Sequence, residues 1–444
     1  MSSENLEFVI SGRSFDRKRQ VAEFHYELGD DHFIETLRFN VLTSRTVDQQ
    51  RLDAALDLAH VLIGTSYYKL RAPGRIRVAQ PLTDAQMAVV EAAYDLGLRE
   101  FAAVNSLRVP HDVRWYVSAR GSVNGTCRPG GRVPLLPIGG GKDSALSMAA
   151  IPEATALAIN PTDAQQRVAS VGAMPLLSVQ RLLDPLLVER TRDGGLNGHV
   201  PVTAINSAVA TLTAVLGGYD PVVFANERSA DEDTVLIDRV PVNHQYSKSF
   251  HFEHLFAIAA RELDITYFSL TRQLSELATV SAVAALPELR SAILSCNRAY
   301  TLDRQSDLNV GPQRWCLECG KCCFTFLCFA VFLSPKDAVR MFGGNPLDKV
   351  SLIEVFTALW GAQKPFDCVG ERAESAAAMA HLATTTAWGS FPVVRKLGSE
   401  ARHEAQRFGA TIESLMTPRG PHLVPDFYVK RLIALLGASQ PPIH

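Results

Sequence analysis

The strongest chemical signal in the sequence is a glycine-rich loop, Ile138–Ser144, with the sequence Ile-Gly-Gly-Gly-Lys-Asp-Ser. It follows an apolar segment that predicts a strand and opens a segment with helical spacing. Glycines let backbone amides approach an anion closely, and the start of a helix offers further amides to phosphate oxygens. Lys142 adds a positive charge and Ser144 a hydroxyl. The loop therefore predicts a phosphate site, and the alternative is a tight strand-to-helix turn without a ligand.

The loop is not a Walker A motif, because Asp143 stands where that motif has Ser or Thr after its lysine. It resembles the PP-loop of ATP pyrophosphatases, usually written Ser-Gly-Gly-x-Asp-Ser, with Gly139 in place of the first serine. This resemblance implies that ATP is split between its α and β phosphates and that AMP passes to a substrate oxygen. It also implies that the phosphates are bound by the residues matching the motif, which are Gly139, Gly140, Gly141, Lys142, Asp143 and Ser144.

The second predicted strand, Ala154–Asn160, is the strand that contacts adenosine in PP-loop domains, and it ends on Asn160. An asparagine at this position is equally expected as the first residue of a loop. A third candidate is Glu227, which follows the predicted strand Pro221–Asn226 at the sheet edge where α/β folds place ligands. We interpret Glu227 as a contact to substrate or Mg²⁺. The alternative is an exposed acidic loop, which suits the neighbouring residues 231–233 better.

A further polar segment, Val242–Ser249, precedes a predicted helix and is dense in titratable groups. It offers a base and a cation for the α-phosphate; these candidates are His244 or Tyr246 for the base and Lys248 for the cation. A polar loop that caps the helix is the simpler alternative. His199, near another helix start, is a weaker candidate because a single histidine in such a place is more often structural.

The third chemical signal is a cysteine cluster, in which Cys316, Cys319 and Cys322 are spaced as Cys-x2-Cys-x2-Cys. Such spacing wraps a tetrahedral metal ion, and Cys296 at the end of a predicted strand is the best fourth ligand. Structural Zn²⁺ is the first interpretation. One alternative is a pair of acid/base thiols on two faces of a stereocentre, as in cofactor-independent glutamate racemases. The other is buried free thiols, which suits Cys323 and Cys328.

The predicted secondary structure that must position these residues differs between three sections of the chain. Two strands around the turn at 29–31 and two helices predict an N-terminal α+β accessory domain at residues 1–130, ending in a Gly-rich linker at 121–131. Residues 131–315 alternate short apolar runs with helical patterns, which predicts a doubly wound α/β sheet, mostly parallel. Its expected strands include Ser291–Cys296, and its expected helices include Ser178–Thr191. Residues 316–444 hold the cysteine cluster and a helical C-terminal region.

Composition limits the function classes. The 444 residues carry a formal net charge of −2, so no general excess of Lys and Arg favours a nucleic-acid partner. The polar start at 1–5 predicts no secretory signal, and the longest apolar run, Cys322–Leu333, is too short to span a bilayer. We therefore expect a cytoplasmic protein without a membrane segment, whereas its oligomeric state is not predicted.

Several blocks together resemble one family, the ATP-dependent epimerases of UDP-N-acetylmuramoyl-L-alanyl-L-glutamate (MurL type), whose core is of the PP-loop type. The blocks span most of the chain and comprise Tyr67–Lys69, Ile138–Ser144, Asn197–Ser207, Val242–Ser249, Ser295–Asn297, Cys316–Phe329 and Cys368–Arg372. The resemblance implies that UDP-MurNAc-L-Ala-L-Glu is the substrate and that its terminal L-Glu becomes D-Glu. ATP and Mg²⁺ would activate the α-carboxylate as an acyl-adenylate, releasing AMP and pyrophosphate.

This activation makes chemical sense, because an α-proton next to an anionic carboxylate is hard to remove. Esterification by AMP removes the charge and lets the carbonyl accept electron density. Two other classes stay open. One is a different PP-loop adenylating enzyme, such as a ligase, an amidotransferase or a 7-cyano-7-deazaguanine synthase-like protein. The other is a non-catalytic scaffold that binds nucleotide and zinc.

Overall fold

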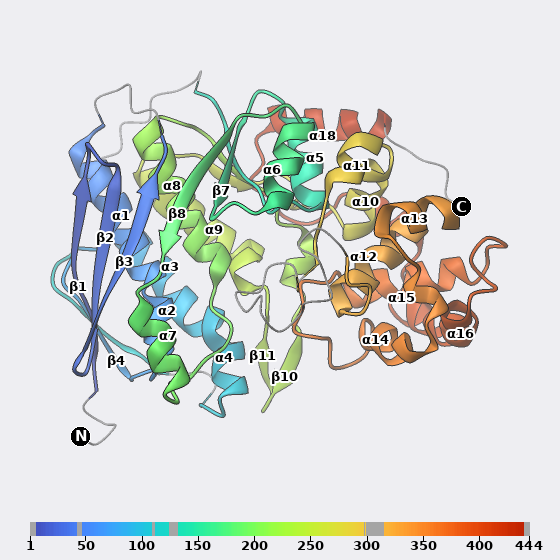
Figure 1. Ribbon diagram of the computed structural model, residues 1–444, viewed down its shortest axis with the longest axis horizontal. Helices are drawn as coiled ribbons and strands as arrows, with labels where there is room; N and C mark the ends of the chain where they lie inside the picture. Colours follow the sequence, from blue (N-terminus) through green and yellow to red (C-terminus); the bar gives the residue numbers. More distant parts are fainter. Residues whose placement is uncertain are drawn as a thin grey trace.

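The computed structural model describes residues 6–41, 47–108, 112–123, 132–296, 298 and 315–438 (Figure 1). Residues 124–131 of the expected linker and Asn297 lie outside the described residues. The described chain forms an α/β fold around one ten-stranded sheet, with a separate two-stranded hairpin. A helical region packs beside the sheet, and Figure 1 shows it as the orange and red end of the chain.

The strands of the large sheet run in the order β12-β9-β6-β7-β8-β3-β2-β1-β4-β5. Their bounds are β1 (Phe8–Asp16), β2 (Val21–Leu28), β3 (Asp31–Phe39), β4 (Arg75–Val78), β5 (Arg114–Val117), β6 (Leu135–Pro137), β7 (Thr155–Ile159), β8 (Leu176–Leu182), β9 (Val222–Phe224) and β12 (Tyr267–Ser269). β10 (Val235–Ile237) and β11 (Val240–Val242) form the hairpin. Neighbours from β12 to β8 are parallel, and β8, β3, β2 and β1 are antiparallel in turn. β4 and β5 are parallel to β1.

The helices of the N-terminal and central parts are α1 (Gln49–Ile63), α2 (Thr65–Tyr68), α3 (Asp84–Asp95), α4 (Arg99–Val104), α5 (Lys142–Ala150), α6 (Asp163–Val171), α7 (Pro185–Arg192), α8 (Val202–Gly217), α9 (Phe250–Glu262), α10 (Glu276–Ala284) and α11 (Pro287–Ala292). Those of the C-terminal part are α12 (Gly320–Ala330), α13 (Pro335–Phe342), α14 (Ile353–Ala358), α15 (Arg372–Leu382), α16 (Pro392–Arg407), α17 (Ile412–Met416) and α18 (Asp426–Ala438). No strand lies within residues 315–438, as the sequence predicts.

The parallel half of the sheet is doubly wound. From β6 the chain passes through α5 to β7 and through α6 to β8, and then returns to the other side of β6 to form β9 and β12. The buried side chains of α5 and α6 belong to one apolar cluster, and those of α8 and α9 belong to a second cluster on the opposite face. The direction of winding therefore reverses between β6 and β9, which is where such sheets bind ligands.

The N-terminal strands continue the same sheet. β3 pairs with β8 from Thr36 opposite Leu182 to Phe39 opposite Val179. Side chains alternate along β3, so that Phe33 and Leu37 are buried while Ile34 faces outward at 44% exposure. One apolar cluster joins this part to α8 and α9. The division at residues 130 and 315 stays a prediction, and the sheet itself crosses the first of these positions.

Two predicted elements are wrong. Ser178–Thr191 was expected as one helix but forms the second part of β8 and then α7, because the Asp184 side chain caps a new helix that starts at Pro185. Ser291–Cys296 was expected as a strand. Its first residues end α11, and the rest is buried without pairing to the sheet, since its Leu294 N–H donates to the Gly140 carbonyl at 3.0 Å. A short apolar run is compatible with a helix, a strand or a buried segment outside the sheet, so the sequence pattern alone does not separate these structures.

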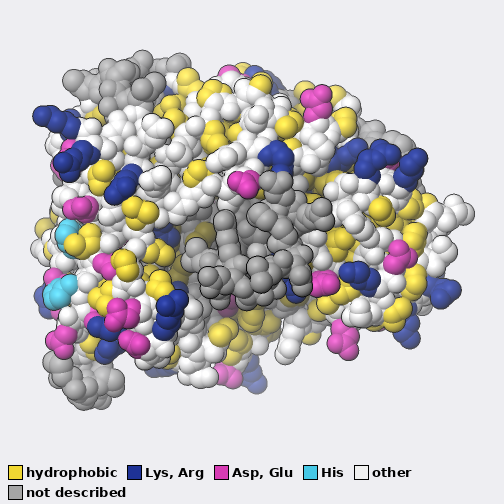
Figure 2. All heavy atoms as spheres, in the orientation of Figure 1, with side chains coloured by type: hydrophobic (Ala, Val, Ile, Leu, Met, Phe, Trp, Pro, Cys, Tyr) yellow, Lys and Arg dark blue, Asp and Glu magenta, His cyan; other side chains and the backbone are white. Residues whose placement is uncertain are grey.

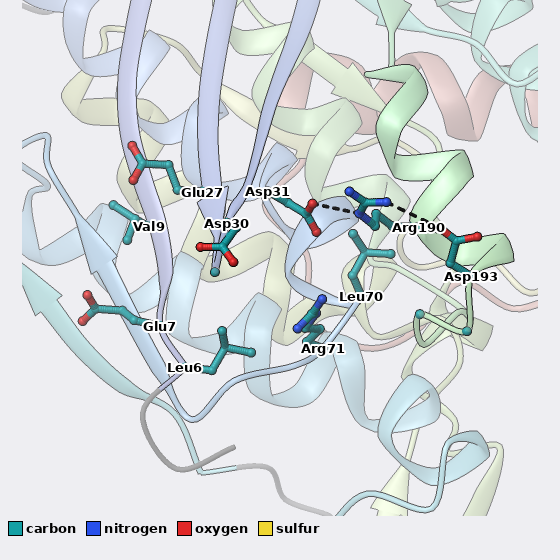
Figure 3. A pocket seen from close by; sticks show the side chains of 13 residues that line it. Leu6, Glu7, Val9, Glu27, Asp30, Asp31, Leu70, Arg71, Arg190 and Asp193 are labelled. Carbon is teal, nitrogen blue, oxygen red and sulfur yellow. Dashed lines mark hydrogen bonds and ion pairs between the residues drawn. The ribbon is translucent and has the colours of Figure 1, made fainter. Parts of the chain in front are cut away.

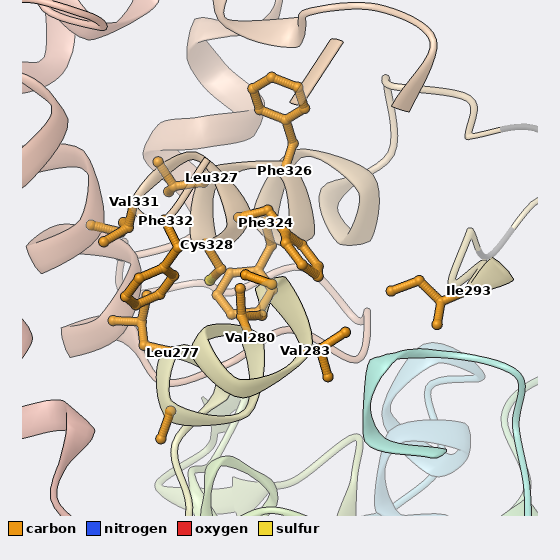
Figure 4. Packing of buried hydrophobic residues seen from close by; sticks show 14 of the residues in the cluster. Leu277, Val280, Val283, Ile293, Phe324, Phe326, Leu327, Cys328, Val331 and Phe332 are labelled. Carbon is orange, nitrogen blue, oxygen red and sulfur yellow. The ribbon is translucent and has the colours of Figure 1, made fainter. Parts of the chain in front are cut away.

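The C-terminal helices bury their apolar faces against α10. Figure 4 shows Leu277, Val280 and Val283 of α10 facing the α12 side chains that include Phe324 and Cys328. These residues are at most 1% exposed. Burial of such large side chains contributes roughly 1.5–3 kcal/mol each. The packing fixes α12, and with it the cysteine cluster, beside the parallel sheet.

The surface agrees with the balanced composition. Figure 2 shows acidic and basic side chains interspersed over the face drawn, without a large field of one sign. Within the residues that the structure describes, no helix has the length and apolar character needed to cross a bilayer.

Candidate functional site

The loop after β6 and the segment after β9 meet in a pocket at the switch point of the sheet. Lys142 and Asp143 come from the first and Glu227 from the second. Lys248, Lys321 and Glu276 complete its charged lining. The sequence predicted four of these six residues as candidates for phosphate, Mg²⁺ or substrate contacts, and the strand order brings them together.

At two positions, neighbouring residues approach the backbone of the glycine-rich loop so closely that side chains would not fit there. Gly140 has a φ of +81°, which favours glycine, and a Cβ there would lie 3.1 Å from the Gln165 nitrogen. A Cβ on Gly141 would lie 2.4 Å from the Ser295 hydroxyl. The Gly139 N–H donates to the Ser144 hydroxyl oxygen at 2.8 Å, which closes the turn. Helix α5 then starts without a side-chain cap, so its first amides stay directed at the pocket.

Lys142 does not extend into solvent. Its Nζ contacts the carboxylates of Asp143 and Glu276 and lies 2.7 Å from Glu227 Oε1, with its side chain 7% exposed. Burial opposes the ammonium charge, but the three carboxylates outweigh it and raise the pKa of Lys142 well above its usual value. Burial also raises the pKa of Glu227 far above its usual range. Three carboxyl groups therefore surround the Lys142 ammonium, and burial favours the neutral form of Glu227 among them.

Arg272 fixes two of the polar segments by their backbones. Its guanidinium donates to the carbonyl of Glu227 at 2.7 Å and to that of Lys248 at 2.5 Å. Its charge is balanced by Glu253 at 2.8 Å, and both side chains are 1% exposed. Arg272 thereby ties the loop after β9 to the loop before α9, although neither segment is adjacent to it in sequence.

We expect Arg272→Met to lower the free energy of unfolding by about 3–5 kcal/mol, because Glu253 then stays buried without its partner. Urea unfolding measures this loss. The matched control is Arg272→Met with Glu253→Gln, which removes both charges and should recover part of it. Stability equal to that of the wild type in the single variant would contradict this account.

Lys248 and His244 both approach a residue that the sequence did not place in the site, Cys368. Lys248 Nζ donates to Cys368 Sγ at 3.1 Å. His244 contacts the Glu100 carboxylate through Nδ1 and also hydrogen-bonds to the Cys368 side chain. Burial would lower the pKa of His244, yet these two partners raise it to about 9. His244 is therefore a cation at neutral pH.

His199 lies beside His244, whereas Tyr246 and Asn160 have other surroundings. The His199 ring centroid lies 4.5 Å from that of His244, and burial lowers the pKa of His199 to about 3. The Tyr246 hydroxyl and His251 Nδ1 are 2.8 Å apart, and Tyr246 does not line the pocket. The Asn160 amide pairs with the backbone of Arg181 at 2.8 and 2.9 Å. Roles for Tyr246 in proton transfer and for Asn160 in adenosine binding stay predictions.

The four candidate metal ligands come together. The Sγ atoms of Cys296, Cys316, Cys319 and Cys322 all lie within 4.8 Å of one another. Cys316 Sγ and Cys322 Sγ are 3.7 Å apart. Two ligands at about 2.3 Å from a tetrahedral ion would be about 3.8 Å apart. Backbone N–H groups of Cys319 and Cys322 each approach a cluster sulfur at 3.4 Å, which favours thiolates. The donor set fits a tetrahedral metal ion.

Cys323 and Cys328 are fully buried in the apolar core beside this cluster. Burial raises the pKa of Cys323 to about 12, so it is a thiol at neutral pH. The aromatic pair Tyr67 and Tyr68 is core as well, at 0% and 1% exposure, and Tyr67 stacks on Tyr26 with centroids 4.8 Å apart.

A second, larger pocket of about 1050 Å³ lies at the ends of β1 and β2 and beside α7 (Figure 3). At the edge of this pocket, Arg190 Nε lies 2.8 Å from Asp31 Oδ1. Five carboxylates line it against two arginines. This excess of negative charge opposes binding of a diphosphate, and the glycine-rich loop does not reach it.

A family model described as the MurL N-terminal domain matches residues 2–270, and one described as the MurL C-terminal domain matches residues 292–411. The chain belongs to the MurL family. A MurL protein of Salinispora tropica, named UDP-N-acetyl-alpha-D-muramoyl-L-alanyl-L-glutamate epimerase, is 37% identical over 98% of this chain and 97% of its own length. Proteins of the same name from Micromonospora sp. and Xanthomonas oryzae pv. oryzae are 36% and 37% identical. They cover 96% and 86% of this chain and 97% and 86% of their own lengths. No solved structure matches the chain.

Sequence reasoning missed three polar members of this MurL site: Glu276, Lys321 and Glu100. Glu276 stands in the first turn of an apolar helix, where an acidic residue is expected for capping alone. Lys321 lies inside the cysteine motif and was taken as its spacer. Glu100 sits on the short helix α4, with no local pattern that marks it. Cys368 belonged to a block of the MurL resemblance, which was the one available signal.

Proposed function

We propose that this chain is an ATP-dependent epimerase that converts the terminal L-Glu of UDP-MurNAc-L-Ala-L-Glu to D-Glu. The observation that carries the proposal is the identity of 36–37% to three proteins named as epimerases of this substrate, over 86–98% of the chain. The loop Gly139–Ser144 at the switch point of the sheet supports the proposal that ATP binds there. We place the reaction in the cytoplasm, where ATP and UDP-linked precursors occur, with a role in peptidoglycan precursor synthesis.

The loop is proposed to act as a PP-loop. The amides of the three glycines and of the first turn of α5 would bind the leaving pyrophosphate, with Lys142 as its counter-ion and Ser144 holding the turn. Lys248 would neutralise the α-phosphate. The substrate carboxylate attacks that phosphorus and releases pyrophosphate, forming an acyl-adenylate. The Cα proton next to the neutral acyl group is then acidic enough for a base to remove it. Hydrolysis of the adenylate follows inversion.

The donor set at the pocket fits Mg²⁺. Oxygens of Asp143, Glu227 and Glu276 lie within 4.8 Å of one another, and Mg²⁺ prefers carboxylate oxygens together with phosphates. Bound Mg²⁺ would neutralise phosphate charge. Lys142, which holds the three carboxylates together, would then be free to pair with the pyrophosphate. The four cysteines fit structural Zn²⁺, whose preferred ligands are thiolates in a tetrahedron.

The test incubates the protein with ATP, Mg²⁺ and UDP-MurNAc-L-Ala-L-Glu in deuterated water. We expect AMP release that depends on the substrate, conversion of L-Glu to D-Glu, and one deuterium at Cα. AMP release without inversion would indicate an adenylating enzyme of another kind, such as a ligase, and would contradict the epimerase function. Nucleotide binding without AMP release, from folded and metal-loaded protein, would indicate a non-catalytic scaffold.

A further inference from the structure

Cys368 lies in the pocket of the glycine-rich loop although it comes from a distant part of the chain. It precedes α15, and its side chain lines the same pocket as Lys142 and Glu227. Two lysines, Lys248 and Lys321, line that pocket with it. Cys368 is half-buried, so a ligand in the pocket can reach its sulfur.

Three cationic groups surround the sulfur of Cys368. Lys248 donates to its sulfur at 3.1 Å, Lys321 adds a second ammonium, and His244 hydrogen-bonds to it from the other loop. His244 is in turn held by the Glu100 carboxylate, which keeps it protonated. Burial alone would raise the pKa of the Cys368 thiol, but these three cations hold it well below its usual value. The contact with Lys248 and the two neighbouring cations therefore favour the thiolate form of Cys368.

Other described groups near the pocket are less suited to take a proton from carbon. Asp143, Glu227 and Glu276 are paired with Lys142. Tyr246 bonds to His251, and the four clustered cysteines fit a metal ion. Cys368 combines a thiolate, access to the pocket and a direct contact with Lys248, the cation proposed for the α-phosphate.

We propose that Cys368 is the catalytic base that removes the Cα proton of the activated glutamate residue, and that the Glu100–His244 pair is its positioning group. This inference rests on the proposed epimerase function. The thiolate lone pair forms the S–H bond while the Cα–H bond breaks. The electron pair of that bond becomes the C=C bond of an enolate, and the carbonyl π pair moves to oxygen. A second acid, exchangeable with solvent, then protonates the opposite face and restores the carbonyl.

The experiment uses the full-length, metal-loaded Cys368→Ala variant in the deuterated-water assay. We expect a loss of deuterium incorporation and of D-Glu by about 10²–10⁴-fold, the usual contribution of a general base, while substrate-dependent release of pyrophosphate, which precedes proton abstraction, stays measurable. The matched control is Cys328→Ala, which removes another buried thiol outside the pocket and should invert normally. Inversion by Cys368→Ala within threefold of the wild type would overturn the assignment. Absence of substrate-dependent AMP from the wild type would instead overturn the epimerase and, with it, this role.

The positioning role is read from the alkylation rate of Cys368 by iodoacetamide as a function of pH, followed by peptide mass spectrometry. Wild-type Cys368 should react at a pH well below the usual thiol range near 8.5. In Glu100→Gln, His244 loses its counter-charge and becomes neutral at lower pH, so the alkylation midpoint should move upward. A structural defect alone would not move this midpoint. An unchanged midpoint in Glu100→Gln would overturn the role of that pair.

Discussion

Replacing Lys142 by methionine is expected to reduce substrate-dependent AMP formation by about 10²–10³-fold, the usual cost of removing one preorganised charge from a reacting anion. It is also expected to destabilise the fold by about 3–5 kcal/mol, because the carboxylates around it then stay buried without a cation. The Lys142 and Glu227 side chains are each 7% exposed and Glu276 is 8% exposed, so water cannot replace the lost ammonium.

The loss of stability should be larger at about pH 7.5 than at about pH 5.5. Burial already raises the pKa of Glu227 above its unfolded value, and removing Lys142 takes away the direct ion pair that opposes this. A carboxyl with a raised folded pKa binds more protons in the native state than in the unfolded state. Stability therefore falls as pH rises through that window. Lys142 itself stays charged at both pH values, because its own pKa is raised.

Urea unfolding at the two pH values measures the stability effect, and coupled detection of AMP measures the activity. The control is the double variant Lys142→Met with Glu227→Gln, which removes one buried negative charge as well. It should recover part of the stability but no activity. Equal destabilisation of Lys142→Met at both pH values would contradict the view that its ammonium compensates buried carboxylates.

Replacing Cys319 by alanine is expected to abolish binding of the zinc ion proposed for the four-cysteine site and to lower the apparent melting temperature by roughly 5–10 °C. Cys319 caps α12 through its side chain, and Cys322 stands within that helix. Loss of the metal would separate this helix end from Cys296. Metal content by mass spectrometry and thermal unfolding give the two readouts.

Activity should fall with the metal although no cluster cysteine lines the phosphate pocket. Just before Cys296, the Leu294 N–H donates to the Gly140 carbonyl at 3.0 Å. The Ser295 hydroxyl lies against Gly141, so the segment that carries the ligand also supports the loop. The matched control is Cys323→Ala, a buried neighbour outside the cluster, which should keep its zinc. Full zinc content in Cys319→Ala would reject the four-cysteine site.

The sequence by itself determined the features that rest on local geometry. The glycine-rich loop with Lys142 and Ser144 could be predicted because its geometry depends only on the strand before it and the helix after it. These elements are β6 and α5. The spacing of Cys316, Cys319 and Cys322 keeps their thiols close together, so the cysteine cluster followed from the spacing. The helix predicted after Val242–Ser249 forms as α9, because its apolar period and its Ser249 cap agree.

The tertiary structure decided which distant groups meet. Cys368 reaches Lys248 across 120 residues, and His244 reaches Glu100 across 144 residues. Neither contact has a local pattern, because each depends on the strand order and on where the C-terminal helices pack. The same dependence explains why Ser178–Thr191 was expected as a helix, since its strand is stabilised by pairing with both β7 and β3. A sequence marks groups that local backbone brings together, whereas the charge around a buried side chain is set by every element packed against it.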